Sequence, residues 1–122
     1  PIPEGIPNLE NPITTIEKEG VLSSVRILKV EDPEHMPDGT RCHIYFTESG
    51  NAKSYDVWAS VYPDGTGAIK IASGIAKSGA LIQGLKPDTD FYLFVTYTDS
   101  EGKMSKPSQP LKVNLKNKFL YQ

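Results

Sequence analysis

Between residues 21 and 116 the chain alternates short runs of β-branched and aromatic residues with turns rich in proline, glycine and aspartate. Runs of this kind are typical of β-strands, and their regular spacing with no helical period predicts an antiparallel sandwich of two sheets. We expect about seven strands in an all-β fold. The runs are "VRILKV" (25–30), "RCHIYFTE" (41–48), "YDVWASVY" (55–62), "AIKIA" (68–72), "GALIQGL" (79–85), "FYLFVTYT" (91–98) and "LKVNL" (111–115).

Alternation within the runs predicts which side chains face the core, because successive residues of a strand point to opposite faces. The first run has an ambiguous phase, which indicates a bulge between residues 25 and 30. The stretch "PDGTG" (63–67) is a turn, since proline presets φ and glycine accepts a positive φ. The predicted core residues are Phe46, Val57, Ala59, Phe91, Leu93, Val95 and Val113.

The second half of the chain resembles a fibronectin type III domain. The resemblance lies in a corner motif with Leu85, Pro87 and Thr89, and in the segment "KPSQP" (106–110) before the last strand. It implies an immunoglobulin-like two-sheet sandwich of the fibronectin type III kind, in which residues 55–62 form the third strand. One residue departs from the family pattern: the corner carries Phe91 where the family has tyrosine, so the tyrosine hydroxyl bond is absent. Such a bond contributes about 1 kcal/mol.

The resemblance makes the third and sixth strands neighbours in one sheet. Their outward side chains then place Trp58, Tyr62, Tyr92 and Phe94 on one outer face. A contiguous apolar patch on a small domain usually marks a contact surface. We consider four interpretations: a cover formed by the N-terminal leader or the C-terminal tail, a docking face for a neighbouring domain, an aromatic platform that stacks on sugar rings, and a homodimer face.

Composition excludes several classes of protein. The formal net charge of −2 provides no basic field for nucleic acid. The longest apolar runs are a few residues, whereas a membrane-spanning helix needs roughly 20. The single cysteine, Cys42, excludes an internal disulfide. Its alternation with Ile44 predicts a buried and inert thiol.

The sequence shows no motif for catalysis, and we expect no catalytic, cofactor or metal site. It has no phosphate-binding glycine loop and no metal-ligand spacing of cysteine and histidine. His35 and His43 have no sequence signal that pairs them with a nucleophile. The loop "EDPEH" (31–35) matches no calcium-loop spacing, so a solvated acidic turn is the better interpretation.

We divide the chain into an extended leader or linker (1–20), a fibronectin type III-like domain (21–116) and a C-terminal tail (117–122). Four prolines in the leader favour extended structure. Because the sequence begins at Pro1 without an initiator methionine, we expect a processed chain or a piece of a longer protein.

The functional expectation is a non-catalytic accessory or spacer module of a larger secreted or cell-surface protein that acts by packing against neighbouring domains of the same polypeptide. A periplasmic location also fits. Modules that look like this often accompany secreted bacterial enzymes that degrade glycans, which is analogy from the fold. The alternative is a small carbohydrate-binding module that contacts polysaccharide through its aromatic face. The loop "DSEGKMSK" (99–106) has no Arg-Gly-Asp adhesion signal.

Overall fold

The computed structural model of the chain describes residues 24–35 and 37–118, and within these ranges every regular element is a strand. The predicted leader and most of the predicted tail lie outside the described residues. The strands are β1 (Ile27–Glu31), β2 (Arg41–Phe46), β3 (Ser54–Ser60), β4 (Ile69–Ile75), β5 (Ala80–Gln83), β6 (Phe91–Thr98) and β7 (Leu111–Val113). The prediction of an all-β fold with about seven strands is therefore confirmed.

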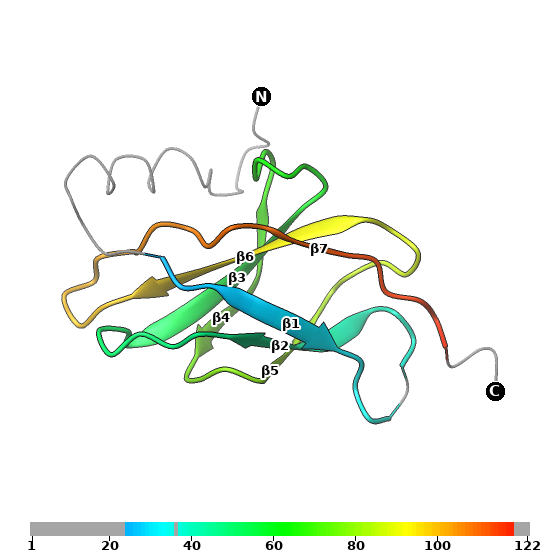
Figure 1. Ribbon diagram of the computed structural model, residues 1–122, viewed down its shortest axis with the longest axis horizontal. Coiled ribbons are helices and arrows are strands. Elements are labelled where there is room, and N and C mark those ends of the chain that lie inside the picture. Colours follow the sequence, from blue (N-terminus) through cyan, green and yellow to red (C-terminus); the bar gives the residue numbers. More distant parts are fainter. Residues whose placement is uncertain (1–23, 36, 119–122) are drawn as a thin grey trace.

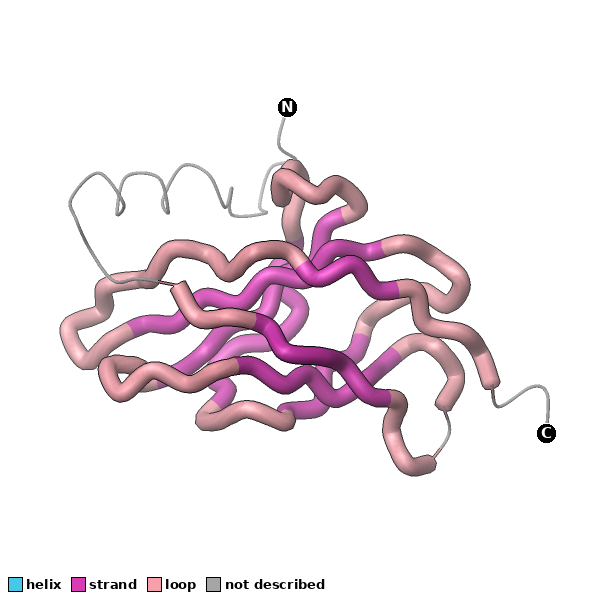
Figure 2. The backbone as a smooth tube through the Cα atoms, in the orientation of Figure 1, coloured by secondary structure: helices cyan, strands magenta, loops and turns pink. Residues whose placement is uncertain are grey.

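The strands form two antiparallel sheets that pack face to face (Figures 1 and 2). One sheet has three strands in the order β1-β2-β5, and the other has four in the order β4-β3-β6-β7. The predicted bulge in the first strand is confirmed, because the register of β1 against β2 shifts between Ile27 and Lys29. β3 and β6 are neighbours in the four-stranded sheet, as expected.

The main core lies between the two sheets. Cys42, Ile44 and Phe46 face it from β2, and Val57 and Ala59 face it from β3. Burial of such side chains contributes roughly 1.5–3 kcal/mol each. Three aromatic rings fill one end of the core: Phe46 and Tyr55 have centroids 4.7 Å apart, and Tyr55 and Tyr97 have centroids 6.1 Å apart.

Six of the seven predicted core residues are buried, and Phe91 is the exception. Phe91 is half-buried and packs against the main core from its margin. It is the first residue of β6 and pairs with Val113 of the short edge strand β7. Since this position lies at the end of the sandwich, the opposing sheet does not enclose the whole ring. The register of β6 itself is as predicted, because Leu93 and Val95 are fully buried.

The half of β6 beyond β7 is bordered by residues 104–110 instead of by a regular strand. The backbone N–H groups of Val95 and Tyr97 donate to the hydroxyl oxygens of Ser108 and Ser105, each over 2.9 Å. In return, the N–H groups of Ser108 and Ser105 donate to the carbonyls of Val95 and Tyr97 over 3.0 and 2.8 Å. The serine hydroxyls therefore accept the bonds that a partner strand would otherwise accept.

The described chain enters the sandwich at one end and leaves at the other (Figure 1). At the entry, the carbonyl of Arg26 accepts a bond from the N–H of Thr47 over 2.8 Å. At the exit, the N–H of Lys118 donates to the carbonyl of Pro37 over 2.8 Å. Gly39 lies close to this exit with φ at +86°, where a Cβ atom would come within 2.8 Å of Pro87. Only glycine fits there.

Candidate functional site

The pairing of β3 with β6 brings the predicted aromatic residues together on the outer face of the four-stranded sheet. Trp58 lies directly opposite Phe94, and Ser60 lies opposite Tyr92. Asp56 lies opposite Thr96 in the same register. The sequence pattern therefore placed Trp58, Tyr92 and Phe94 on the correct face.

The exposure of these rings differs from the expectation of an open aromatic platform. Trp58 is 1% exposed and Phe94 is 4% exposed. With the buried Ala68 they form a second apolar cluster, against which Tyr92 and Met104 pack (hereafter the outer cluster). Ala68 comes from the connection between β3 and β4, and Met104 comes from the connection between β6 and β7. The burial disagrees with the sugar-platform interpretation, and none of the four interpretations named these two connections as a cover, because strand alternation does not show which connections pack over an outer face.

The connection between β3 and β4 is held in place by its own side chains. The Ser60 hydroxyl donates to the carbonyl of Thr66 over 2.6 Å and accepts a bond from the N–H of Tyr62 over 3.0 Å. The carboxylate of Asp64 accepts bonds from both the N–H and the hydroxyl of Thr66. These two bonds hold the pKa of the exposed Asp64 carboxyl below its usual value. The resulting tight turn positions Ala68 against the rings.

Polar groups on the outer face are paired with one another. The indole Nε1 of Trp58 donates to the Thr96 hydroxyl over 3.0 Å. The ammonium of Lys70 lies 5.2 Å from the centre of the Trp58 ring and 3.6 Å from a carboxylate oxygen of Asp56. The other Asp56 oxygen accepts the N–H of Gly74 over 3.3 Å. The outer cluster is therefore a small second core with satisfied polar groups, on which a sugar ring could not stack directly.

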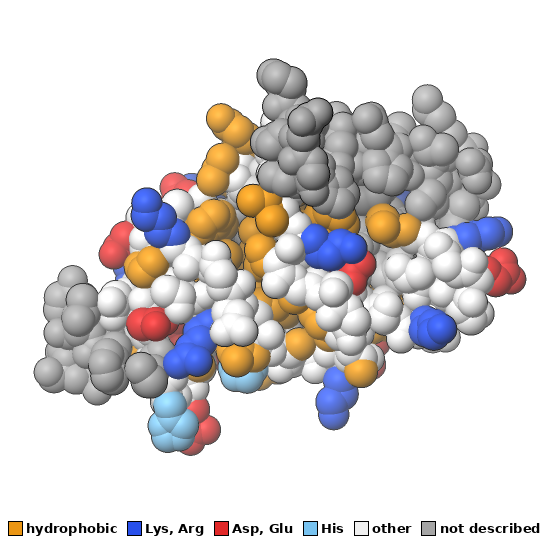
Figure 3. Space-filling view, turned by 180° about the vertical axis from the view of Figure 1, so that it is seen from behind, with side chains coloured by type: hydrophobic (Ala, Val, Ile, Leu, Met, Phe, Trp, Pro, Cys, Tyr) orange, Lys and Arg blue, Asp and Glu red, His pale blue; other side chains and the backbone are white. Residues whose placement is uncertain are grey.

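Tyr62 lies outside this cluster and is 55% exposed. Two further apolar residues near the same turn are also exposed, Val61 at 54% and Ile69 at 51%. We call Val61, Tyr62 and Ile69 the hairpin patch. The turn that carries it projects from the body of the sandwich (Figure 1), and hydrophobic side chains lie at the surface when the molecule is seen from behind (Figure 3).

The sequence pattern does not indicate Val61 and Ile69 as surface residues. Val61 has the inward phase of the predicted strand 55–62, whereas β3 ends at Ser60. Ile69 pairs with the inward-facing Ala59 but lies where the sandwich ends. Both residues continue the inner face beyond the opposing sheet. A signal was present, because the turn "PDGTG" begins directly after Tyr62.

A groove of about 400 Å³ borders the outer cluster at Phe94. Its described lining consists of Ser24, Phe94, Lys106, Pro107, Ser108, Gln109 and Pro110 (hereafter the Phe94 groove). Ser24 is the first described residue of the chain, whereas the remaining wall belongs to the segment that borders β6. The chain therefore enters the described structure along one wall of this groove.

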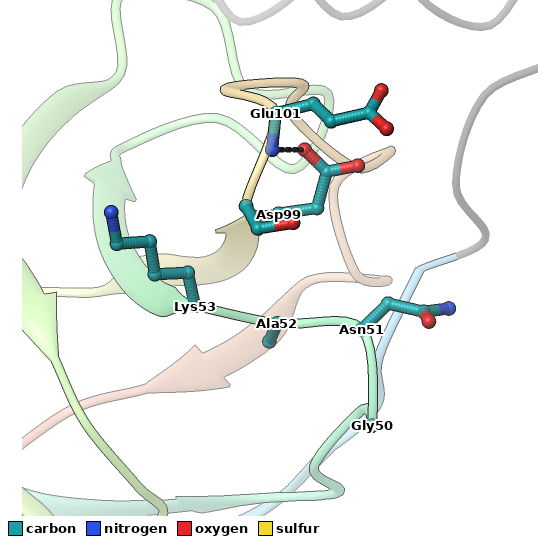
Figure 4. Close-up of a pocket in the computed structure, with 7 residues that line it drawn as sticks. Gly50, Asn51, Ala52, Lys53, Asp99 and Glu101 are labelled. Carbon is teal, nitrogen blue, oxygen red and sulfur yellow. Dashed lines mark hydrogen bonds between the residues drawn. The ribbon is translucent and has the colours of Figure 1, made fainter.

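A larger hollow of about 660 Å³ lies between the β2–β3 and β6–β7 connections (Figure 4). Gly50, Asn51, Ala52 and Lys53 line one side, and Asp99, Ser100 and Glu101 line the other. The carboxylate of Asp99 accepts the N–H groups of Glu101 and Lys103, each over 2.9 Å. Since this carboxylate closes its own turn, we assign it a structural role.

The residues considered for chemistry in the sequence lie apart. Cys42 is fully buried, and burial raises the pKa of its thiol to about 11. His43 is bonded through Nδ1 to the carbonyl of Gly79 over 3.1 Å. Among residues 24–35 and 37–118, no three acidic, histidine or cysteine side chains gather as a metal site. No helix long and apolar enough to cross a membrane occurs in the same ranges.

Comparison with known proteins identifies the fold. No family model matches the chain, and no curated protein sequence matches it. Solved structures of fibronectin type III domains do match. An Fn3-like protein from Clostridium thermocellum has a TM-score of 0.61 at 19% identity, with 74% of this chain and 88% of that chain covered. A fibronectin type III domain of the human KIAA0970 protein has a TM-score of 0.63 at 14% identity, with 84% and 82% covered.

A third match is to part of an enzyme. The structure of a family 28 exopolygalacturonase from Yersinia enterocolitica has a TM-score of 0.54 at 11% identity, and the match covers 75% of this chain but 20% of that chain. At these identities the similarity establishes the fold alone. The chain is an all-β protein with the fibronectin type III-like sandwich fold.

Proposed function

We propose that the chain is a non-catalytic accessory or spacer module of a larger secreted or cell-surface protein. It acts by packing against neighbouring parts of the same polypeptide, with a contact face to which Tyr62 and the half-buried Tyr92 contribute surface, while Trp58 and Phe94 form the buried layer beneath it. The observation that carries the proposal is the hairpin patch: three large apolar side chains, each more than half exposed, lie at the β3–β4 end of the four-stranded sheet. Exposed apolar groups gathered in one place favour a contact surface.

The path of the chain supports a spacer role. The described residues enter the sandwich at one end and leave at the other (Figure 1). The two points at which flanking segments attach therefore lie at opposite ends of its long axis (Figure 1). The hairpin patch lies toward the exit end, since Ala59 pairs with both Leu93 and Ile69 near the start of β6. A neighbour beyond this end would meet the patch.

The glycan-related role stays part of the proposal through one comparison. The exopolygalacturonase match shows that a fold of this kind makes up a fifth of one enzyme chain.

The alternative, a small carbohydrate-binding module, depends on Tyr62. Of the four predicted contact rings, Tyr62 is more than half exposed, whereas Trp58 and Phe94 are buried. A binding platform usually needs several open rings or a concave pocket. The geometry therefore favours the spacer role over polysaccharide binding.

Hydroxyl-radical footprinting tests the proposal. Labelling of Tyr62, Val61 and Ile69 is compared between the chain of residues 1–122 and the full-length polypeptide that contains it. We expect these three side chains to be protected in the full-length polypeptide, while the exposed Leu28 on the other sheet serves as the unprotected control. Equal labelling of the hairpin patch in both samples would refute domain packing. A saturable change in Trp58 fluorescence on addition of soluble polysaccharide would favour the alternative.

A further inference from the structure

The Phe94 groove and the outer cluster point to a specific occupant of part of the contact face. We propose that residues 13–22 of this chain, "ITTIEKEGVL", dock into the Phe94 groove and along the outer cluster in cis. This inference rests on the proposed role of the face as a contact surface, but it requires no neighbouring domain. Residues 1–23 lie outside the described residues, and their sequence supplies length, charge and apolar spacing.

The attachment point carries the first step of the inference. Ser24 is itself a wall of the groove, and the ring of Phe94 lines the same groove. Leu22 precedes Ser24 by two residues and can therefore lie no more than about 7 Å from it along the chain. An apolar side chain is thus tethered beside an apolar ring. Tethering gives such a segment an effective concentration on the order of millimolar without any further contact.

The length of the segment fits the width of the face. Ile16 precedes Ser24 by eight residues, which can span up to about 28 Å when extended. Adjacent strands are about 4.8 Å apart, so crossing from the groove over β6 to β3 requires roughly 10 Å. Ile13 and Ile16 can therefore reach the half-buried Tyr92 and Met104, which border the outer cluster.

Charge also favours this occupant. The docking segment 13–22 contains two glutamates against one lysine, which leaves a formal charge of −1. Among the described residues that line the groove, Lys106 is the one charged side chain. Lys70 lies over Trp58 on the same face, and Lys112 lies beside Tyr92 in the register of β6 and β7. The two glutamates therefore cross a face with three lysines, of which Lys70 and Lys112 also pair with Asp56 and Asp90.

The groove is shaped for an extended segment. Pro107 and Pro110 have no N–H, and the Ser108 N–H and hydroxyl are bonded to Val95. The wall therefore offers few backbone donors, and its apolar part, supplied by Phe94 and the two prolines, is smaller than its polar part. Side-chain packing, and not strand pairing, is the interaction that this wall supports.

Nuclear magnetic resonance of the labelled chain of residues 1–122 tests the inference. We expect nuclear Overhauser contacts from the methyl groups of Leu22 and Ile16 to the rings of Phe94 and Tyr92, with ring-current shifts of those methyls. Methyl shifts equal to those of a free peptide of residues 1–22, with no such contacts, would overturn the proposal. A sample that mixes labelled and unlabelled chains separates contacts within one chain from contacts between copies. Contacts only between copies would also overturn it.

A variant pair sharpens the test. Replacement of both apolar anchors, Ile16→Asp with Leu22→Asp, should increase hydroxyl-radical labelling of the half-buried Tyr92 and Met104, while the amide spectrum of β1–β7 persists. The matched control is Leu28→Asp, the same kind of change at a 52% exposed position on the three-stranded sheet. We expect the control to leave the labelling of Tyr92 and Met104 unchanged. Equal labelling in the anchor variant and in the unmodified chain would contradict docking. Because this test uses residues 1–122 alone, its failure leaves the footprinting result on domain packing unaffected.

Discussion

The two faces of the four-stranded sheet are both buried, but they are buried in different ways. The inner side chains of β3 and β6 pack against a complete second sheet and are almost entirely apolar. The outer side chains include Asp56, Ser60 and Thr96 between the rings, and they are covered by connections and bordered by a groove. The depth of burial of a sheet face therefore does not by itself reveal whether a second sheet packs on that face. Where a loop covers the face, buried polar side chains can lie beside aromatic rings, provided that each polar group has a hydrogen-bond partner.

The main core and the outer cluster each contain one residue type that occurs once in the chain. Cys42 reports on the inner core, and Trp58 reports on the outer cluster. The two faces can therefore be followed separately in the same molecule.

The largest expected effect concerns the labelling of Cys42 by a thiol reagent at about pH 8. In the folded chain the thiol is fully buried, and burial raises its pKa from 9.0 to about 11. Labelling needs unfolding or local opening, so we expect a rate at least about 10³-fold lower than in urea-unfolded chain. Stopped-flow absorbance with Ellman's reagent measures the labelling rate. Equal rates in the folded and unfolded chain would show that the inner core is open.

The same raised pKa fixes the sign of a pH effect. The folded state holds the thiol proton more tightly than the unfolded state, so this contribution to stability is fully present below about pH 9. It is lost as the pH rises toward the folded pKa of about 11. We expect the urea midpoint to fall across that range, and to fall less in Cys42→Ala. An identical fall in both would assign the effect to other groups.

Truncation compares the two faces directly. Trp58→Ala should lower the free energy of unfolding by about 3–5 kcal/mol, because it removes a large buried ring and leaves the Thr96 hydroxyl without its donor. Leu93→Ala on the inner face should cost about 2–5 kcal/mol. Urea unfolding followed by circular dichroism measures both. A loss under about 1 kcal/mol for Trp58→Ala, beside a large loss for Leu93→Ala, would show that the outer cluster is peripheral.

A substitution at the serine-bonded edge of β6 should have a smaller effect on the free energy of unfolding. Ser108→Ala removes the acceptor of the Val95 N–H and leaves a buried donor unpaired, which costs about 1–3 kcal/mol. Ser100→Ala in the exposed β6–β7 turn is the matched control and should change stability by less than about 0.5 kcal/mol. Equal stability of the two variants would mean that water replaces the serine hydroxyl.

The smallest expected effect on stability comes from substituting two lysines that each lie over an aromatic ring. Lys70 and Lys29 each lie 5.2 Å from a ring centre, over Trp58 and Tyr45 respectively. Lys70 is partly enclosed with the buried Asp56, whereas Lys29 and Glu31 are both well exposed. Lys70→Gln should cost about 0.5–1 kcal/mol. Lys29→Gln should leave the urea midpoint unchanged, and a larger loss there would mean that enclosure does not strengthen the contact.

The inner face could be predicted from the sequence, while the cover of the outer face could not. Alternation in β2, β3 and β6 identifies Ile44, Val57 and Leu93 correctly, because a regular strand fixes the direction of each side chain. Ala68 and Met104 lie in or beside connections, where no period relates a residue to the surface it contacts. For the same reason the pattern identified Trp58 and Phe94 as partners but did not show that these connections bury them.

Strand ends limited the prediction in a second way. Phe91 and Val61 have the inward phase, yet one is half-buried and the other is exposed. Phase gives the face of a strand, whereas burial also depends on whether the opposite sheet extends that far. The serine hydroxyls along β6 were also unpredictable, since the motif "KPSQP" (106–110) indicates a break in a strand and not which acceptors replace it.

The border of β6 has a consequence for how copies of this molecule behave when they are crowded. A strand with open N–H and C=O groups is a template onto which another chain can add, and this is a route to aggregation. Here the polar groups of Val95 and Tyr97 are already occupied by Ser108 and Ser105, and the neighbouring Pro107 and Pro110 cannot donate to an incoming strand. This edge therefore resists intermolecular β-sheet growth even though its flanks are rich in aromatic residues.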